Sequence, residues 1–323
     1  MVALFNRGSQ APDGRDAGSL RERFRAWWDG EEILEPLEEP VPAADAESEL
    51  EHAERDAAPR QYWEPARVSL VQDIWGQGFS SPGGREYILT KVTIFGLDPA
   101  MTVLDLGTGL GGAARTMCEK FGVWVTGFEA DAALAEAAMA LSVKAGMSEK
   151  VPINAFDPKA FEHKAKSVDC VFSKEFLFTV ANKPKFLKAV ENLLKLKGQF
   201  LFTDYVLAKP RLSSPVLKEW MAHEPLKPYP WAIEDYQDAL TAVRLDIRVT
   251  EDVTEDFRAM VIKGWTDYIE SARRGSLSEQ SALVLVDEVE CWTRRIQAID
   301  SGDLKVCRMH VFKKDAERLM SDW

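Results

Sequence analysis

Short apolar runs recur through the middle of the chain, and segments with helical periodicity separate them. Five runs of strand length occur, at residues 102–106, 123–128, 151–156, 168–172 and 199–203. Before the last run, a stripe of apolar side chains at helical spacing covers Lys183–Leu196, and Gly198 predicts the end of that helix. Strands that alternate with helices are typical of a parallel sheet covered on both faces.

The pattern changes after residue 205. Prolines and aromatic residues concentrate over residues 206–236, which predicts a helical cap inserted after the fifth strand. Residues 245–249 suit a sixth strand, helices are expected over about 259–273 and 281–299, and Val306–Phe312 suits an antiparallel edge. The predicted fold is α/β: a doubly wound, mostly parallel seven-stranded sheet with an inserted helical cap and an N-terminal extension.

The first 60 residues differ from the rest. Leu20–Trp28 places apolar side chains on one side and arginines on the other, which predicts a short amphipathic helix. Such a helix docks on its own domain or contacts a partner or a membrane surface peripherally. Residues 31–56 hold eleven acidic residues, one arginine and three prolines, which predicts a mobile linker.

These patterns predict six consecutive parts of the chain. They are an N-terminal arm (1–30), an acidic linker (31–60), lid helices (61–100), a cofactor-binding core (101–205), a substrate cap with the sixth strand (206–305), and a final strand with a tail (306–323).

Charge and composition narrow the function classes. The net charge is −12, but eleven acids and one arginine give residues 31–56 a charge of −10, so the remainder is nearly neutral. It has no basic stripe of the kind that nucleic acids need. No apolar run is long enough to span a membrane, the N-terminus lacks a signal peptide, and the four cysteines fit neither disulfides nor a metal site. We expect a cytoplasmic protein without a metal, and the sequence leaves its oligomeric state open.

The clearest chemical signal is Val103–Gly112, an apolar strand followed by an acid and a glycine-rich turn. Such a turn lets a ligand approach the backbone, and the helix after it points its amides at that ligand. Gly107, Gly109 and Gly112 also fit the dinucleotide pattern G-x-G-x-x-G. Asp105 favours S-adenosylmethionine over NAD(P), because a carboxylate pairs with an ammonium and a sulfonium but not with a pyrophosphate.

A second acid follows the second strand. Glu129 lies 24 residues after Asp105, near the offset at which an acid meets a ribose diol. Asp131 is an alternative, although it suits the N-cap of the helix expected over Ala132–Ala145 better.

The pattern D-x-G-x-G-x-G formed by Asp105, Gly107, Gly109 and Gly111 resembles the first motif of the class I S-adenosylmethionine methyltransferases. The resemblance implies a Rossmann-like fold in which these four residues contact the cofactor. It also implies an acid after the third strand that accepts from the adenine amino group. Asp157 stands there, and because a proline follows it, a turn is equally consistent.

Residues Trp75–Gly84 resemble a segment of the phosphobase (phosphoethanolamine) N-methyltransferases and related small-amine methyltransferases. The resemblance implies a lid over the methionine end of the cofactor, with Ser80 and Ser81 as cofactor contacts. Four glycines beside bulky aromatic residues suit a mobile lid. A rigid turn before the next helix is the alternative.

The resemblance continues to Tyr205. That family has Ser-Arg-Asp after the fourth strand, and Ser173-Lys174-Glu175 stands here, which implies that Lys174 lies along the cofactor and Glu175 holds a cationic head group. Its Thr-Asp-Tyr recurs as Thr203-Asp204-Tyr205, whose tyrosine helps to bind the phosphobase in the family. Two positions depart from the family: Val71 replaces its catalytic tyrosine and Thr179 its histidine.

One histidine, His223, lies in the segment expected to cover the substrate, where it is either a catalytic group or a surface residue. Aromatic residues around it suit either a cage for a cationic group or the core of the cap.

We therefore predict an S-adenosylmethionine-dependent methyltransferase for a small polar or amphiphilic metabolite, with nitrogen favoured as the acceptor atom. The catalytic candidates are Glu175, Tyr205 and His223. The alternatives are O- or S-methylation of a small metabolite or lipid head group, a non-catalytic S-adenosylmethionine-binding regulatory module, and an NAD(P)-dependent oxidoreductase.

Overall fold

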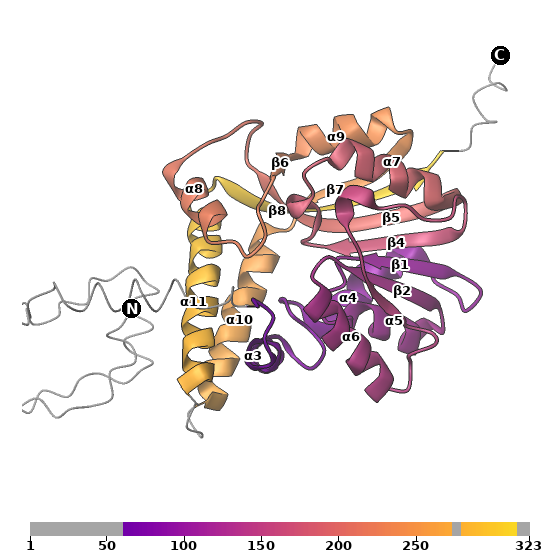
Figure 1. Cartoon of the computed structure of the whole chain (residues 1–323). Coiled ribbons are helices and arrows are strands. Elements are labelled where there is room, and N and C mark those ends of the chain that lie inside the picture. Colours follow the sequence, from indigo (N-terminus) through magenta and orange to yellow (C-terminus); the bar gives the residue numbers. More distant parts are fainter. Residues whose placement is uncertain (1–60, 273–278, 315–323) are drawn as a thin grey trace, which may run out of the picture. The chain divides into compact units, whose positions relative to one another are not determined.

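The computed structural model describes residues 61–272 and 279–314 (Figure 1). The predicted amphipathic helix Leu20–Trp28 and the acidic linker 31–60 lie outside the described residues. Those two predictions therefore stay predictions.

One twisted sheet organises the described residues, and its strands meet in an order that differs from their order in the sequence. The order is β3 (Ile153–Ala155), β2 (Trp124–Glu129), β1 (Thr102–Leu106), β4 (Val168–Lys174), β5 (Leu194–Leu207), β8 (Leu304–Lys313) and β7 (Leu245–Asp252), and the two-residue β6 (Trp231–Ala232) pairs with the end of β5. Strands β1 to β5 pair in parallel, whereas β8 runs antiparallel to both of its neighbours. The predicted doubly wound, mostly parallel sheet with an antiparallel last strand is confirmed. Within the described residues, the sheet has eight strands and not the predicted seven, because the short β6 joins β5, and β8 lies inside the sheet because β7 forms the edge beside it.

Helices cover both faces of this sheet. The first layer holds α4 (Gly84–Val92), α5 (Gly112–Phe121) and α6 (Ala132–Lys144), and the second holds α7 (Lys183–Leu193) and α9 (Ile233–Ala242). Successive residues of a strand point to opposite faces, so Val103 of β1 packs into the first layer while Leu104 and Leu106 pack into the second.

Four further helices gather beside the sheet (Figure 1). They are α3 (Pro65–Trp75), α8 (Pro215–Ala222), α10 (Thr254–Ala272) and α11 (Glu279–Asp300). The ring of Trp75 lies 4.7 Å from that of Trp292 and 6.0 Å from that of Trp265, so aromatic packing joins α3 to α10 and α11.

The predicted end of the helix at Gly198 is wrong. Helix α7 ends at Leu193, and Gly198 lies inside β5, which begins at Leu194. A Cβ atom at Gly198 would stand 2.8 Å from the carbonyl oxygen of Lys195, where the pairing of β4 with β5 is irregular. The glycine permits this close backbone approach and does not terminate a helix.

Two aromatic residues of the 206–236 segment belong to the core. Trp220 and Tyr236 are fully buried, and the Tyr236 hydroxyl donates to Asp204 Oδ2 at 2.5 Å. Trp220 packs 6.0 Å from the rings of Phe178 and Tyr205. Trp220 and Tyr236 therefore belong to a packed core, which was one of the two alternatives for these aromatic residues, and not to an open cage for a cationic group.

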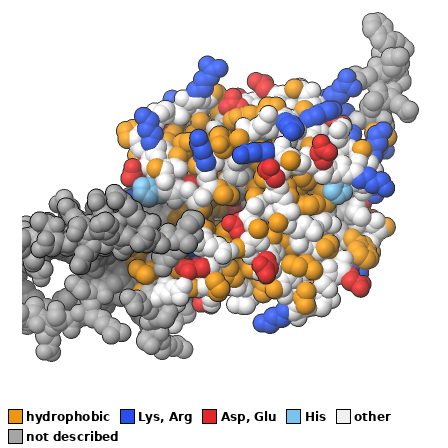
Figure 2. All heavy atoms as spheres, in the orientation of Figure 1, with side chains coloured by type: hydrophobic (Ala, Val, Ile, Leu, Met, Phe, Trp, Pro, Cys, Tyr) orange, Lys and Arg blue, Asp and Glu red, His pale blue; other side chains and the backbone are white. Residues whose placement is uncertain are grey.

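No helix within residues 61–272 and 279–314 is long and apolar enough to cross a bilayer, and the same residues contain no cluster of metal-binding side chains. Figure 2 shows acidic, basic and hydrophobic side chains interspersed on one face.

We expect the ion pairs of Arg67 to stabilise the packing of α3 against α11. It is 3% exposed and pairs with Glu288 and with Asp287, at 3.1 Å, on α11. Replacement by alanine leaves the buried Glu288 without this cation, so we expect Arg67→Ala to lower the free energy of unfolding by about 3 kcal/mol in urea titrations. The matched change Arg258→Ala, which breaks an exposed pair with Asp300, should cost less than about 1 kcal/mol. Equal losses would contradict this account.

Candidate functional site

The carboxyl ends of the central strands bring the predicted site residues to one edge of the sheet. In the register of the sheet, Leu106 at the end of β1 lies opposite Phe128 of β2 and Ser173 of β4. Asp105, Glu129 and Lys174 therefore stand at neighbouring positions, although they are up to 69 residues apart in the sequence. Open parallel sheets bind ligands at this edge.

The turn after β1 requires its glycines. Gly107, Gly109 and Gly111 have φ values of +73°, +56° and +77°. A Cβ at Gly107 would lie 2.3 Å from the Phe176 side chain, and one at Gly109 would lie 2.3 Å from Ser80 Oγ. Backbone conformation and close approach thus both exclude larger residues here.

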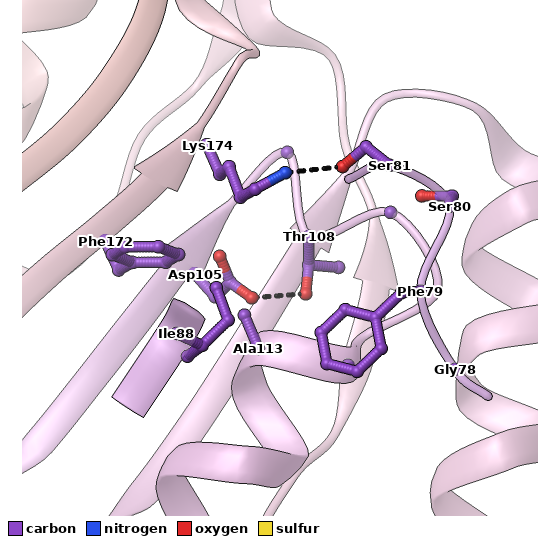
Figure 3. A pocket seen from close by; sticks show the side chains of 13 residues that line it. Gly78, Phe79, Ser80, Ser81, Ile88, Asp105, Thr108, Ala113, Phe172 and Lys174 are labelled. Carbon is purple, nitrogen blue, oxygen red and sulfur yellow. Dashed lines mark hydrogen bonds between the residues drawn. The ribbon is translucent and has the colours of Figure 1, made fainter. Parts of the chain in front are cut away.

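Asp105 is a buried carboxyl group with one side-chain hydrogen bond. It is 1% exposed, and Thr108 Oγ1 donates to its Oδ2 at 2.6 Å (Figure 3). Burial raises the pKa of Asp105 to about 7, against the opposite effects of the Thr108 hydroxyl and the positive charge of Lys174. The group is poised to lose its proton when a cation binds beside it.

The Asp105 side chain lines a pocket. Residues Gly78–Ser81, which we call the strap, form the opposite wall of this pocket. The cavity is small, with a volume of about 40 Å³, and it is open to solvent on one side. Figure 3 shows the strap facing the Asp105–Thr108 pair across this space. Its lining comprises Gly78, Phe79, Ser80, Ser81, Ile88, Asp105, Gly107, Thr108, Gly109, Gly112, Ala113, Phe172 and Lys174.

Arg115 of α5, which the sequence analysis did not single out, links the strap to the glycine turn. Its Nη2 donates to the carbonyl of Leu110 at 2.6 Å and to that of Gly78 at 3.4 Å, and its Nη1 donates to that of Ala138 at 3.3 Å. The side chain is buried, and burial lowers the pKa of Arg115. An arginine within the buried stretch of a helix is the signal that could have revealed it.

Glu129 stands at the end of β2 with its carboxylate held by backbone amides. Its Oε2 accepts from Gly109 N at 2.8 Å, and its Oε1 accepts from the amides of Ala130 and Asp131. Burial raises the pKa of Glu129, although these amide bonds act in the other direction. Asp131 is the N-cap of α6, accepting from Ala133 N and Leu134 N, as its alternative interpretation had it.

Asp157 is exposed and accepts from Lys159 N at 2.9 Å, as the turn interpretation of this residue expects. Its predicted contact with the adenine amino group stays a prediction. Nearby, the rings of Phe128 and Phe156 lie 5.6 Å apart, and those of Phe156 and Phe176 lie 5.8 Å apart. Phe176 is buried, and the partly buried Phe128 and Phe156 pack against the same hydrophobic cluster.

Lys174 and Glu175 join the strap to the end of β5. Lys174 Nζ lies 2.7 Å from Ser81 Oγ and 2.6 Å from Glu175 Oε2, and Thr203 Oγ1 donates to Glu175 Oε1 at 2.7 Å. Glu175 has a φ of +44°, which is unusual for a residue with a side chain, and its amide donates to the carbonyl of Thr203. The Glu175 backbone is thus held in an unfavourable conformation, and its carboxylate is fixed by Lys174 and Thr203.

Tyr205 lies near this group but has little access to solvent. It is 2% exposed and packs edge-on against Phe178 and Phe257. Burial raises the pKa of Tyr205 well above its usual value, so its hydroxyl stays protonated.

His223 is not gathered into this site. It is exposed after the end of α8, and its Nδ1 lies 2.8 Å from the carbonyl oxygen of Glu219. A catalytic role for His223 stays a prediction without geometric support.

Comparison with known proteins supports this architecture. Residues 97–256 match the family model described as a methyltransferase domain. Phosphoethanolamine N-methyltransferase 1 of Arabidopsis thaliana is 27% identical over 238 residues, which cover 74% of this chain and 47% of that protein. The sarcosine/dimethylglycine N-methyltransferase of Aphanothece halophytica is 32% identical over 109 residues, covering 33% of this chain and 39% of that protein. The chain thus spans about half the length, or less, of these curated relatives.

A solved structure shares the fold. Phosphoethanolamine N-methyltransferase 2 of Haemonchus contortus, in complex with S-adenosyl-L-methionine, superposes with a TM-score of 0.70 at 23% identity, covering 79% of this chain and 59% of that chain. The chain therefore carries a methyltransferase domain with the class I, Rossmann-like fold, and it resembles the phosphoethanolamine N-methyltransferases.

The close approach of Ser80 to Gly109 generates a test with a matched control. Gly109→Ala places an alanine in the left-handed backbone region, and its Cβ would clash with Ser80 of the strap. Gly146→Ala imposes the same backbone strain, at φ +68°, but its Cβ would have no atom within 4 Å. We expect Gly146→Ala to cost about 1 kcal/mol of unfolding free energy and Gly109→Ala about 1 to 3 kcal/mol more. Hydrogen exchange should rise at Gly78–Ser81 in the Gly109 variant alone. Identical behaviour of the two variants would show that the strap does not rest on the turn.

Proposed function

We propose that this protein, which carries a methyltransferase domain over residues 97–256, is an S-adenosylmethionine-dependent enzyme that methylates the nitrogen of a small polar or amphiphilic amine. The observation that carries the proposal is the buried carboxyl group of Asp105 beside a turn that only glycine can form. A buried acid there suits the cationic methionine end of this cofactor and disfavours a pyrophosphate.

The residues present fit the cofactor. Asp105 would pair with its ammonium group, the glycine turn would cradle its methionine moiety, and Glu129, already oriented by amides, would accept from the ribose hydroxyls. Asp157 is the proposed partner of the adenine amino group. The aromatic rings of Phe128 and Phe156 would pack against the base.

The strap is proposed to be a lid. Ser80 rests on Gly109 and Ser81 is bound to Lys174, so the strap contacts both the cofactor turn and the acceptor side. Gly76, Gly78 and Gly83, with φ values of +99°, +80° and +113°, can take up the change in backbone conformation on opening. In this proposal, residues 61–100 act as lid, 101–205 as cofactor core and 206–305 as substrate cap.

The chemistry follows from the charges. When bound, S-adenosylmethionine supplies a methyl group that an amine lone pair displaces from sulfur in line. Positive charge then develops on the acceptor nitrogen, and the buried Glu175 carboxylate stabilises it by accepting its N–H. Thr203 and Lys174 fix this carboxylate through its two oxygens. Tyr205 remains a proposed acceptor contact through its protonated hydroxyl.

The pKa of Asp105 predicts how binding depends on pH. A carboxyl group with a pKa of about 7 in the free protein must lose its proton to pair with the ligand's ammonium group. Binding therefore strengthens as the pH rises towards 7 and weakens up to about tenfold for each unit below it. Calorimetry with S-adenosylhomocysteine between pH 5.5 and 8 should show this slope and proton release below pH 7. The Asp105→Asn variant should bind S-adenosylhomocysteine weakly, and its affinity should not depend on pH in this way. An equal pH dependence in that variant would show that Asp105 does not pair with the ligand.

Activity itself tests the function. With S-adenosylmethionine and a panel of small amines, alcohols and thiols, mass spectrometry should find S-adenosylhomocysteine and an amine product heavier by about 14 mass units. Glu175→Gln should lower kcat/KM about 100-fold, or about 2.7 kcal/mol, and change S-adenosylhomocysteine affinity less than twofold. The exposed Glu136→Gln on α6 is the control and should match the parent protein. Turnover of alcohols or thiols alone would refute the choice of nitrogen, and cofactor binding without turnover of any acceptor would favour a non-catalytic module.

A further inference from the structure

A buried ion pair stands beside the proposed acceptor contact Tyr205. Arg295 of α11 places its guanidinium carbon 6.0 Å from the centre of the Tyr205 ring and 4.5 Å from that of Trp292. Its partner Glu224 follows the end of α8. The two side chains are 14% and 2% exposed, so the pair is nearly removed from water.

The pairing uses both ends of the carboxylate. Arg295 Nε donates to Glu224 Oε1 at 2.6 Å, and its Nη2 donates to Oε2 at 2.6 Å. The indole Nε1 of the fully buried Trp220 also donates to Oε1, at 2.5 Å. A bidentate fork with a third donor fixes the carboxylate firmly, and moving it away would leave a buried charge without a partner.

Two further cations near Thr203 lie close to acids. Lys174 is paired with Glu175 at 2.6 Å, and Arg308, which lies opposite Thr203 in the sheet, is paired with Glu251 at 2.8 Å. Lys174 is thus held by a carboxylate of the chain, whereas the buried Nε of Arg308 has no hydrogen-bond partner among the described residues.

From this arrangement we infer that the acceptor is an amine that carries no phosphate, and that Glu224 is the residue that sets this specificity. The inference rests on the proposed function and narrows its substrate class. A phosphomonoester needs guanidinium or ammonium donors that are available to it, and Glu224 occupies the fork of Arg295 that would serve. The fixed Glu224 carboxylate would also repel a phosphate dianion that approached Arg295. A neutral or cationic amine meets neither obstacle, and Glu175 attracts it.

The inference separates this chain from relatives that its fold resembles. A second structure of the Haemonchus contortus enzyme, 22% identical with a TM-score of 0.68, is a complex with phosphomonomethylethanolamine and S-adenosylhomocysteine. In this chain, the Glu224 carboxylate occupies the Arg295 guanidinium.

Ethanolamine and O-phosphoethanolamine provide a matched pair of probes. Full-length protein saturated with S-adenosylhomocysteine should show no binding of O-phosphoethanolamine at 1 mM by calorimetry, and kcat/KM in the presence of S-adenosylmethionine should favour ethanolamine at least tenfold. Glu224→Gln frees the Arg295 fork without changing side-chain size, and we expect it to reduce that preference at least tenfold and to permit O-phosphoethanolamine binding. Glu219→Gln on the same helix breaks an exposed 3.7 Å pair with Arg294 and should change neither result.

The outcomes separate the two proposals. Binding of O-phosphoethanolamine to the parent protein, or an unchanged preference in folded Glu224→Gln, overturns the inference and leaves the methyltransferase function intact. Failure to bind S-adenosylhomocysteine or to methylate any amine overturns the proposed function. If Glu224→Gln does not fold, the calorimetry of the parent protein alone still decides the inference.

Discussion

The site depends on one constraint: a carboxyl group must be buried at the end of β1. Asp105 is 1% exposed, and burying a charged carboxylate is costly, so its pKa is raised to about 7. The surrounding features follow from this burial. Thr108 supplies a hydrogen bond, the glycine turn removes the side chains that would fill the space, and the strap closes it from above. A more exposed acid would hold an ammonium less strongly, because water would screen the pair.

The strap and the acceptor side are connected through charged groups rather than through packing alone. Arg115 fastens Gly78 to the helix that follows the glycine turn, and Lys174 fastens Ser81 to Glu175. Closing the lid would therefore complete the positioning of Glu175. The same contact that would exclude water from the cofactor would orient the carboxylate that is proposed to bind the acceptor.

Much of this architecture could be predicted from the sequence, because it depends on local patterns. Apolar runs predicted the alternation of strands and helices, and the turn of Asp105 to Gly111 predicted where the pocket lies on the sheet. The structure confirms the fold. The misplaced helix end shows the limit: Gly198 has the residue type of a helix terminator, but its neighbours across the sheet decide its role. Glu224 was missed for a similar reason. Glu224 and Arg295 are 71 positions apart, and no local pattern in the sequence reports that they meet.

The two departures from the phosphobase family now have structural explanations. Val71 is 1% exposed within α3, where it contributes to packing, and Thr179 Oγ1 donates to the carbonyl of Phe176 within a short turn. Neither position offers an acid or base, so the tyrosine–histidine pair is not rebuilt there. Methyl transfer to an amine lone pair does not require such a pair, provided that the amine is held neutral and aligned. In the proposed enzyme the alignment would come from the fixed Glu175 carboxylate, whose two oxygens are already oriented by Thr203 and Lys174. A carboxylate does not keep an amine neutral, so the amine must react in the form that has already lost its proton. Rate enhancement would then come from alignment and electrostatics rather than from a proton relay.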